Sequence, residues 1–73
     1  MPEYKVGMKV VDKQCDRYGV GEVKEIWMYE GSQSQILVEY PKLKNMEPSP
    51  LPTVLYDWAE AVDSLIVVET SNA

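Results

Sequence analysis

Apolar and polar residues alternate along several short stretches of this chain, which is the pattern of strands that bury one face. Between residues 35 and 40, Ile36, Val38 and Tyr40 fall on one face, and Leu37 and Glu39 fall on the other. Similar alternation, or a high content of β-branched and aromatic residues, predicts strands over residues 8–14, 20–30, 35–40, 53–58 and 64–69. The sequence therefore predicts an all-β chain of five short strands.

The stretch 20–30 is predicted to be the longest strand, although a helix competes for it. Its residues Val20, Val23 and Ile26 are spaced by three, as on one face of a helix. Two glycines near its start and the aromatic residues near its end favour instead a strand bent by a bulge. A polar turn over residues 30–34 leads into the next strand, so the two are expected to pair as an antiparallel hairpin.

Polar residues and prolines mark the segments between the strands. Residues 14–19 and 42–52 are predicted to be loops, and the second contains three prolines, which suit neither a central strand nor a helix interior. Within it, residues 46–53 are expected to form a stiff loop, with a polyproline-type ligand for another protein as the alternative. About one helical turn is predicted over residues 59–63, and residues 70–73 are expected to fray.

The length and composition fit one small folded domain. The chain has 73 residues, 45% of them hydrophobic, and its five Tyr and two Trp are too many for a chain that stays unfolded. We therefore expect a single domain over residues 1–73, with a core between about residues 4 and 69. No stretch approaches the roughly 18 apolar residues of a membrane span, and the N-terminus lacks a secretory signal pattern, so a cytoplasmic protein is expected.

Two short motifs in the N-terminal half resemble a known group of small barrels. Residues 4–11 (Tyr-Lys-Val-Gly-Met-Lys-Val-Val) and 18–26 (Tyr-Gly-Val-Gly-Glu-Val-Lys-Glu-Ile) resemble the opening of the KOW, Tudor and CarD-type barrels, and residues 62–68 resemble their final strand. Together with the long bent second strand, this resemblance implies an SH3-like five-stranded small barrel with one short helical turn before the last strand. Closure of the sheet into a barrel removes its exposed edges.

The resemblance leaves a nucleic-acid role as the alternative to protein binding. KOW domains commonly contact RNA or proteins of transcription and translation, and the CarD-type domain is similar to modules that bind bacterial RNA polymerase. The net charge of −5 and the pI near 4.5 repel phosphates unless the cations gather on one face. The residues that would have to gather are Lys5, Lys9, Lys13, Lys24, Lys42 and Lys44.

Catalytic chemistry is not expected. The chain has no His and a single cysteine, so the usual general bases and metal ligands are missing, and we expect no metal and no cofactor. That cysteine, Cys15, is expected to be a small structural residue rather than a reactive thiol. A less favoured alternative is an oligomeric pore enzyme similar to the plasmid-borne dihydrofolate reductase, whose Gln-Ile-Tyr segment corresponds to Val54-Leu55-Tyr56. Only the tyrosine matches, so the activity is not carried over.

The exposed face of the second and third predicted strands is the candidate protein-binding site. If Ile26 and Met28 face the core, Trp27 and Tyr29 project from the opposite face. Large exposed aromatic residues are enriched at protein interfaces. The alternative is that the bulge reverses the phase and makes Trp27 part of the core. The candidate site residues are Trp27, Tyr29, Leu37, Glu25 and Tyr18.

Two other groups of residues permit more specific hypotheses. Acidic side chains could form a face for a basic partner, or simply a solubility surface: Glu22, Glu25, Asp57, Glu60 and Asp63. Three aromatic rings would form a cage for a methylated cation only if they converge: Tyr18, Tyr56 and Trp58. The sequence thus predicts a small acidic accessory protein, suited to a phage or mobile element, that acts through protein contact or self-association.

Overall fold

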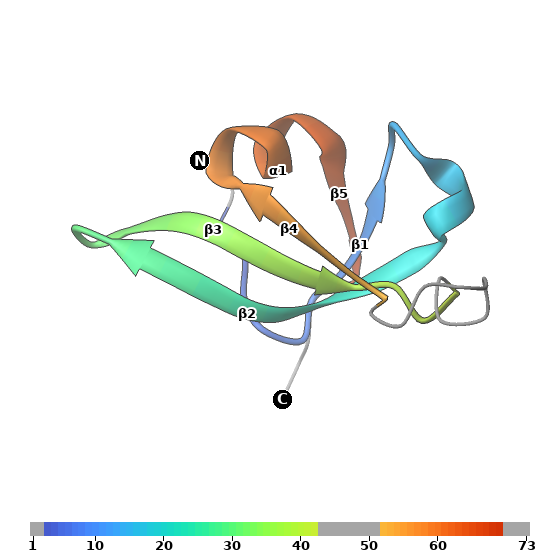
Figure 1. The fold of residues 1–73 in the computed structure, drawn as a ribbon, viewed down its shortest axis with the longest axis horizontal. Coiled ribbons are helices and arrows are strands. Elements are labelled where there is room, and N and C mark those ends of the chain that lie inside the picture. Colours follow the sequence, from blue (N-terminus) through green and yellow to red (C-terminus); the bar gives the residue numbers. More distant parts are fainter. Residues whose placement is uncertain (1–2, 43–51, 70–73) are drawn as a thin grey trace.

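The computed structural model describes residues 3–42 and 52–69, which form five strands and one short α-helix (Figure 1). In chain order the elements are β1 (Lys9–Asp12), a 3-10 turn (Asp16–Tyr18), β2 (Val20–Tyr29), β3 (Ser32–Glu39), β4 (Thr53–Asp57), α1 (Trp58–Ser64) and β5 (Leu65–Glu69). β2 and β3 form a long hairpin whose tip lies at the left of Figure 1, and α1 connects β4 to β5. The described part of the chain is mostly β, as the alternation predicts.

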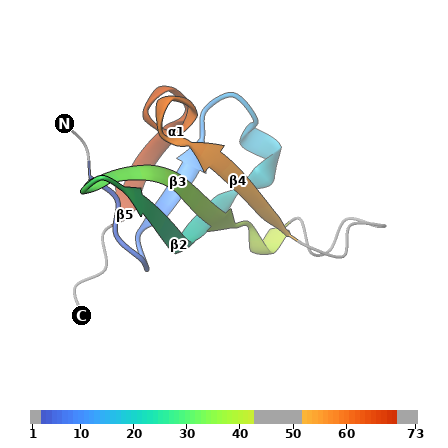
Figure 2. The same cartoon turned by 60° about the vertical axis from the view of Figure 1, so that its left-hand side comes forward.

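All five strands belong to one antiparallel sheet, in the order β4-β3-β2-β1-β5. β4 and β5 are the edges of this sheet, and within the described residues they are not paired with each other. The sheet is strongly twisted, and α1 lies across the end where β4 stops and β5 begins (Figure 2). The fold is therefore a single five-stranded antiparallel sheet with a short helix before its last strand.

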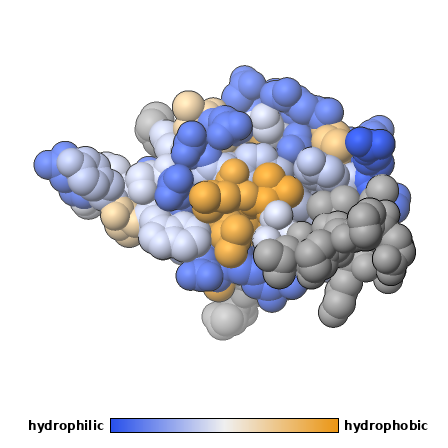
Figure 3. Space-filling view, in the orientation of Figure 1, coloured by the Kyte–Doolittle hydropathy of each residue, from blue (hydrophilic) through white to orange (hydrophobic). Residues whose placement is uncertain are grey.

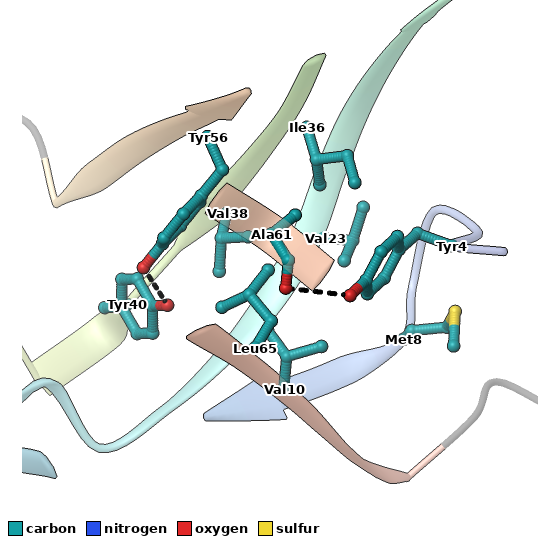
Figure 4. Packing of buried hydrophobic residues seen from close by; sticks show 10 residues of the cluster. All are labelled: Tyr4, Met8, Val10, Val23, Ile36, Val38, Tyr40, Tyr56, Ala61 and Leu65. Carbon is teal, nitrogen blue, oxygen red and sulfur yellow. Dashed lines mark hydrogen bonds between the residues drawn. The ribbon is translucent and has the colours of Figure 1, made fainter. Parts of the chain in front are cut away.

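The hydrophobic core lies between the inner face of the sheet and α1 (Figure 4). Its largest fully buried side chains come from β1, β2, β3 and the residue after β3: Val10, Val23, Ile36, Val38 and Tyr40. The other buried members are Tyr4, Met8, Tyr56, Ala61 and Leu65. The prediction that alternate residues between 35 and 40 face the core is confirmed, and the apolar area that they remove from water stabilises the fold.

A short chain of polar groups crosses this core. The Tyr56 hydroxyl donates a hydrogen bond to Oδ2 of the buried Asp12, with an oxygen–oxygen distance of 2.7 Å. Because this bond uses the single phenolic proton of Tyr56, the Tyr40 hydroxyl is the donor in the 2.6 Å bond between the two tyrosines (Figure 4). Asp12 Oδ1 accepts a further bond from the backbone N–H of Gln14 at 2.8 Å. The chain joins the end of β1 to β4 and to the end of β3.

Position 21 in β2 requires glycine, because neighbouring side chains leave no room for a Cβ atom. It is paired with Val10 of β1 and lies against Tyr40 and Val38. A Cβ atom built on Gly21 would lie 2.6 Å from Tyr40 Cε1 and 2.6 Å from Val38 Cγ1. Only a residue without a side chain fits where the strand packs so closely against the core.

β2 confirms the strand that the sequence predicts over residues 20–30, and the competing helix is wrong. Its pairing with β3 shifts register between Val23 and Glu25 and again between Trp27 and Met28, so the predicted bulge is also confirmed. β4 and β5 lie within the predicted stretches 53–58 and 64–69.

β1 is shorter than the predicted strand 8–14. Before it, the Met8 N–H donates to the Lys5 carbonyl at 3.1 Å in a turn where Gly7 has φ 98°. After it, the Cys15 N–H donates to the Asp12 carbonyl at 3.1 Å. These turn bonds mark the two ends of β1, although the Val23 N–H still donates to the Met8 carbonyl at 2.9 Å and the Lys13 N–H donates to the Ser64 carbonyl at 2.8 Å.

β3 begins at Ser32, earlier than the predicted start at residue 35. The link between β2 and β3 is a two-residue turn in which Glu30 has φ 50° and Gly31 has φ 80°. Positive φ values at both positions match the tight turn that joins twisted hairpin strands. Tyr29 therefore pairs directly with Ser32, and polar residues that the pattern predicts as a loop are strand.

α1 is longer than the helical turn predicted over residues 59–63. It includes Trp58, which the sequence places at the end of the preceding strand. Asp57 and Glu60 form a capping box, in which the Asp57 N–H donates to Glu60 Oε1 at 3.3 Å. This cap starts the helix immediately after β4. The predictions for residues 43–51, which include the polyproline hypothesis, and for the tail 70–73 lie outside the described residues.

Candidate functional site

The register of β2, β3 and β4 defines the outer face of this part of the sheet. Residues directly opposite each other share a face, so Trp27, Gln35 and Asp57 form one row across the three strands. The neighbouring row consists of Glu25, Leu37 and Leu55. Both rows lie on the face opposite the buried side chains of these strands.

Three apolar side chains on this face form what we call the outer-face patch: Trp27, Leu37 and Leu55. Leu37 and Leu55 are paired directly, and Trp27 is a diagonal neighbour of Leu37. Trp27 is 42% exposed and Leu55 is 50% exposed, whereas Leu37 is half-buried. In Figure 3, an apolar area lies over the middle of β3 and β4. The sheet thus presents a contiguous apolar surface to solvent.

The bulge in β2 determines the direction of Trp27. Val23 is fully buried, and the extra residue in the bulged strand is Lys24. Lys24 and Glu25 are both exposed, after which Ile26 packs against the core again. Trp27 then projects outward, so its predicted exposure is confirmed and the alternative that makes it core is wrong.

Two carboxylates lie beside the outer-face patch. Glu25 is exposed and paired with Leu37, and Asp57 is exposed at the end of β4. The amide of Gln35 donates to Asp57 Oδ1 at 3.3 Å, which holds this carboxylate on the Trp27 row. Within the described residues, neither carboxylate forms an ion pair with a lysine or arginine.

A row of ion pairs borders the same face on the other side of Glu25. Lys9 Nζ lies 2.7 Å from Glu22 Oε1, and Lys24 Nζ lies 3.4 Å from Glu22 Oε2 and 3.5 Å from Glu39 Oε1. Hydrogen bonds from the two lysines lower the pKa of Glu22, and its carboxylate raises the pKa of Lys24. Two cations of the nucleic-acid alternative are therefore engaged by carboxylates.

Tyr29 lies at the tip of the hairpin, beyond the patch. It is 68% exposed, and its neighbour Met28 is exposed too, because the tip extends past the core (Figure 1). The Ser34 hydroxyl donates to the Trp27 carbonyl at 3.2 Å and supports the hairpin at its second register shift. The expectation that Met28 faces the core is wrong, whereas the exposure of Tyr29 is confirmed.

Tyr18 does not join the other candidate residues. It ends the 3-10 turn after β1 and packs against Tyr40, with ring centroids 4.9 Å apart. Tyr40 follows the C-terminal end of β3, whereas Trp27 pairs with Gln35 in the middle of that strand. Burial raises the pKa of the Tyr18 phenol, and the neighbouring Cys15 raises it further. Tyr18 is thus a supporting side chain at the far end of the sheet.

The three rings of the proposed cation cage pack with other partners. Tyr56 is buried in the polar chain of the core. Trp58 is half-buried and packs edge-on against Tyr4, with centroids 5.7 Å apart and planes at 79°. With Tyr18 against Tyr40, the three rings are used in separate contacts, so the cage hypothesis has no support in this arrangement.

Leu55 is the site residue that sequence reasoning missed. Alternation between residues 53 and 58 places Leu55 on the face opposite Tyr56, which is a usable signal. The pairing of β4 with β3 is what brings Leu55 to Leu37, and it joins segments on either side of residues 43–51. One sequence does not specify that pairing.

Other chemistry receives no support from the described residues. Within residues 3–42 and 52–69, no group of three or more Cys, Asp or Glu side chains is placed to hold a metal ion. Cys15 is a half-buried free thiol beside the 3-10 turn. No helix in the same residues has the length and apolar character needed to cross a bilayer.

Comparisons with protein-family models, curated protein sequences and solved structures find no match for this chain.

Proposed function

We propose that this chain is a small acidic protein-binding module that contacts its partner through the outer-face patch. The supporting observation is that Trp27 and Leu55 are exposed beside Leu37 on one face of a hydrogen-bonded sheet. A tryptophan held by a strand buries a large area on binding and loses little rotamer freedom. An apolar centre of this kind is what interface hot spots require.

We further propose that the sheet belongs to an SH3-like small barrel. The long bent β2, the position of β1 between β2 and β5, and the short helix α1 before the last described strand support this assignment. In this fold the outer surface of the strands is free for contacts, because the inner surface is filled by side chains.

Nucleic-acid binding is less well supported than protein binding. The outer face carries Glu25 and Asp57, and the lysines that the structure describes on it, Lys9 and Lys24, are paired with carboxylates. An oligonucleotide would have to displace these pairs against a net charge of −5. Oligonucleotide binding that weakens steeply with added salt would support a nucleic-acid role instead.

The proposed function is tested by capturing partners from a lysate of the organism that encodes the chain. Wild-type protein, Trp27→Ala and Trp27→Thr are compared, with Val20→Thr as the control. Val20 is exposed in the same strand but away from the patch. We expect both Trp27 variants to lose the captured protein at least about tenfold while Val20→Thr retains it.

Far-UV circular dichroism and urea unfolding accompany this comparison. The Trp27 variants should keep the wild-type spectrum, because the indole is partly exposed and contributes little to the core. Thr keeps the β-branched character suited to a strand, which makes it the safer of the two substitutions. Equal capture by folded Trp27 variants and wild type would contradict the proposed function.

A further inference from the structure

We propose that the outer-face patch binds a basic partner segment that carries apolar anchor residues, such as the face of a cationic amphipathic helix. This inference depends on the proposed function and adds the chemistry of the partner. The supporting observation is the set of charged side chains around Trp27, Leu37 and Leu55.

The border of the patch is acidic. Glu25 is paired with Leu37, Asp57 lies on the Trp27 row, and neither is neutralised by a cation within the described residues. Among the described residues, the lysines on this face are Lys9, whose Nζ lies 2.7 Å from Glu22, and Lys24, whose Nζ lies 3.4 Å from Glu22 and 3.5 Å from Glu39. The remaining described cations lie outside these strands: Lys5, Lys13, Arg17 and Lys42.

The backbone of both acidic residues is held by strand pairing, and the Asp57 side chain is also held by its own contacts. Asp57 accepts the Gln35 amide and belongs to the capping box of α1. Glu25 follows the bulge, where the backbone is held by pairs on both sides. An ionised carboxylate has room for several donors, so each can still accept an ammonium or guanidinium from a partner.

The same charges disfavour a second copy of this chain as the occupant. A self-contact across the patch would bring the Glu25 and Asp57 carboxylates of both copies into one interface. Like charges placed together at an interface oppose association, and the net charge of −5 on each copy opposes it further. A basic segment meets both the apolar centre and the acidic border.

The test follows the fluorescence of Trp27 after the other tryptophan of the chain, Trp58, is replaced. In a Trp58→Phe background, Trp27 is the single tryptophan, and its emission reports on the patch. The probes are three synthetic helical peptides of about 18 residues that share one amphipathic pattern. They are built from Leu and Lys, from Leu and Glu, and from Ser and Lys. Calorimetry with the unmodified chain repeats each titration, so the result does not depend on the Trp58 substitution.

We expect the Leu/Lys peptide to shift Trp27 emission to shorter wavelength and the other two peptides to bind at least about tenfold more weakly. Glu25→Gln with Asp57→Asn should weaken Leu/Lys binding about fivefold, and the same peptide should bind less tightly as NaCl rises from about 0.05 to about 0.3 M. Asn still caps a helix, so Asp57→Asn removes charge and leaves α1 in place. Asp16→Asn, a matched loss of charge at the 3-10 turn, should change binding less than about twofold.

Three results would overturn the inference. Equal binding of the Leu/Lys and Leu/Glu peptides would show that charge does not select the partner, and equal binding of the Ser/Lys peptide would show non-specific attraction. A dimer in sedimentation that dissociates on Trp27→Thr would make a second copy the occupant. These results concern the chemistry of the partner and not protein binding as such. If the Trp27 variants still capture less lysate protein than wild type, the proposed function holds. If they capture as much as wild type, the proposed function is contradicted as well.

Discussion

At the scale of single residues, the chain from Tyr40 through Tyr56 to Asp12 is the most constrained feature of the core. Burial raises the pKa of Tyr40 to about 12. Burial, with the hydrogen bonds to Tyr40 and Asp12, raises the pKa of Tyr56 far above its ordinary value. The fold therefore stabilises both phenols in their protonated form.

This polar chain predicts a loss of stability at alkaline pH. In the unfolded chain tyrosine titrates near pH 10, so the stabilisation is complete below about pH 10 and is lost as the pH rises toward 12. Urea unfolding followed by circular dichroism should give a constant free energy of unfolding from about pH 7 to 9 and a decline above about pH 10. The free energy of unfolding of Tyr40→Phe should fall less steeply with pH than that of wild type. Tyr29→Phe, which changes a residue at the exposed tip of the hairpin, should show the same pH dependence as wild type. An equally steep decline in Tyr40→Phe would contradict this assignment.

Gly21 gives a second prediction at this scale. Gly21→Ala places a methyl group 2.6 Å from atoms of Tyr40 and Val38, so it should lower the free energy of unfolding by about 1–3 kcal/mol. Gly31→Asn is the matched control, because Gly31 has open space around it and Asn tolerates the left-handed φ of 80°. Its effect in the same urea titration should be smaller, and equal losses in the two variants would refute the steric explanation.

At the scale of elements, the β2–β3 hairpin determines how the site is presented. Its turn places Glu30 at φ 50°, a conformation that costs an L-residue about 1 kcal/mol and that Asn adopts more readily. Glu30→Asn should therefore raise the free energy of unfolding by about 0.5 kcal/mol. Thermal and urea unfolding both measure this change, and a decrease in stability would show that the turn is not the tight type described here.

The sequence predicts the elements wherever a strand buries one face, and it fails where local polar contacts set the boundary. Alternation between residues 35 and 40 identifies the buried face of β3, but the polar start of that strand at Ser32 depends on the turn at Glu30 and Gly31. Likewise, the capping box of Asp57 and Glu60 converts Trp58 from predicted strand to helix. Hydrophobic periodicity carries no information about either contact.

The candidate site is predicted in part for similar reasons. Strand alternation suggests that Trp27 and Tyr29 are exposed, but the bulge at Lys24 decides the phase, and a single sequence does not locate it. Leu55 joins the patch only through long-range pairing of β4 with β3. Tyr18 is excluded from it because the 3-10 turn directs the ring toward Tyr40.

At the scale of the whole molecule, charge and exposed apolar area together define the proposed role. The chain carries 12 acidic and 7 basic residues, and on the outer face the described cations Lys9 and Lys24 are paired with glutamates. Two further carboxylates, Glu25 and Asp57, border an apolar patch on a sheet supported by its own core. This combination supports the proposal that the patch contacts an apolar, basic surface.

The most direct test of the account is the dissociation constant of the captured partner for Trp27→Thr compared with wild type. We expect at least about tenfold weaker binding with an unchanged free energy of unfolding, because the proposed function places the indole in the contact surface. An unchanged dissociation constant, or weaker binding accompanied by unfolding of the variant, would contradict it.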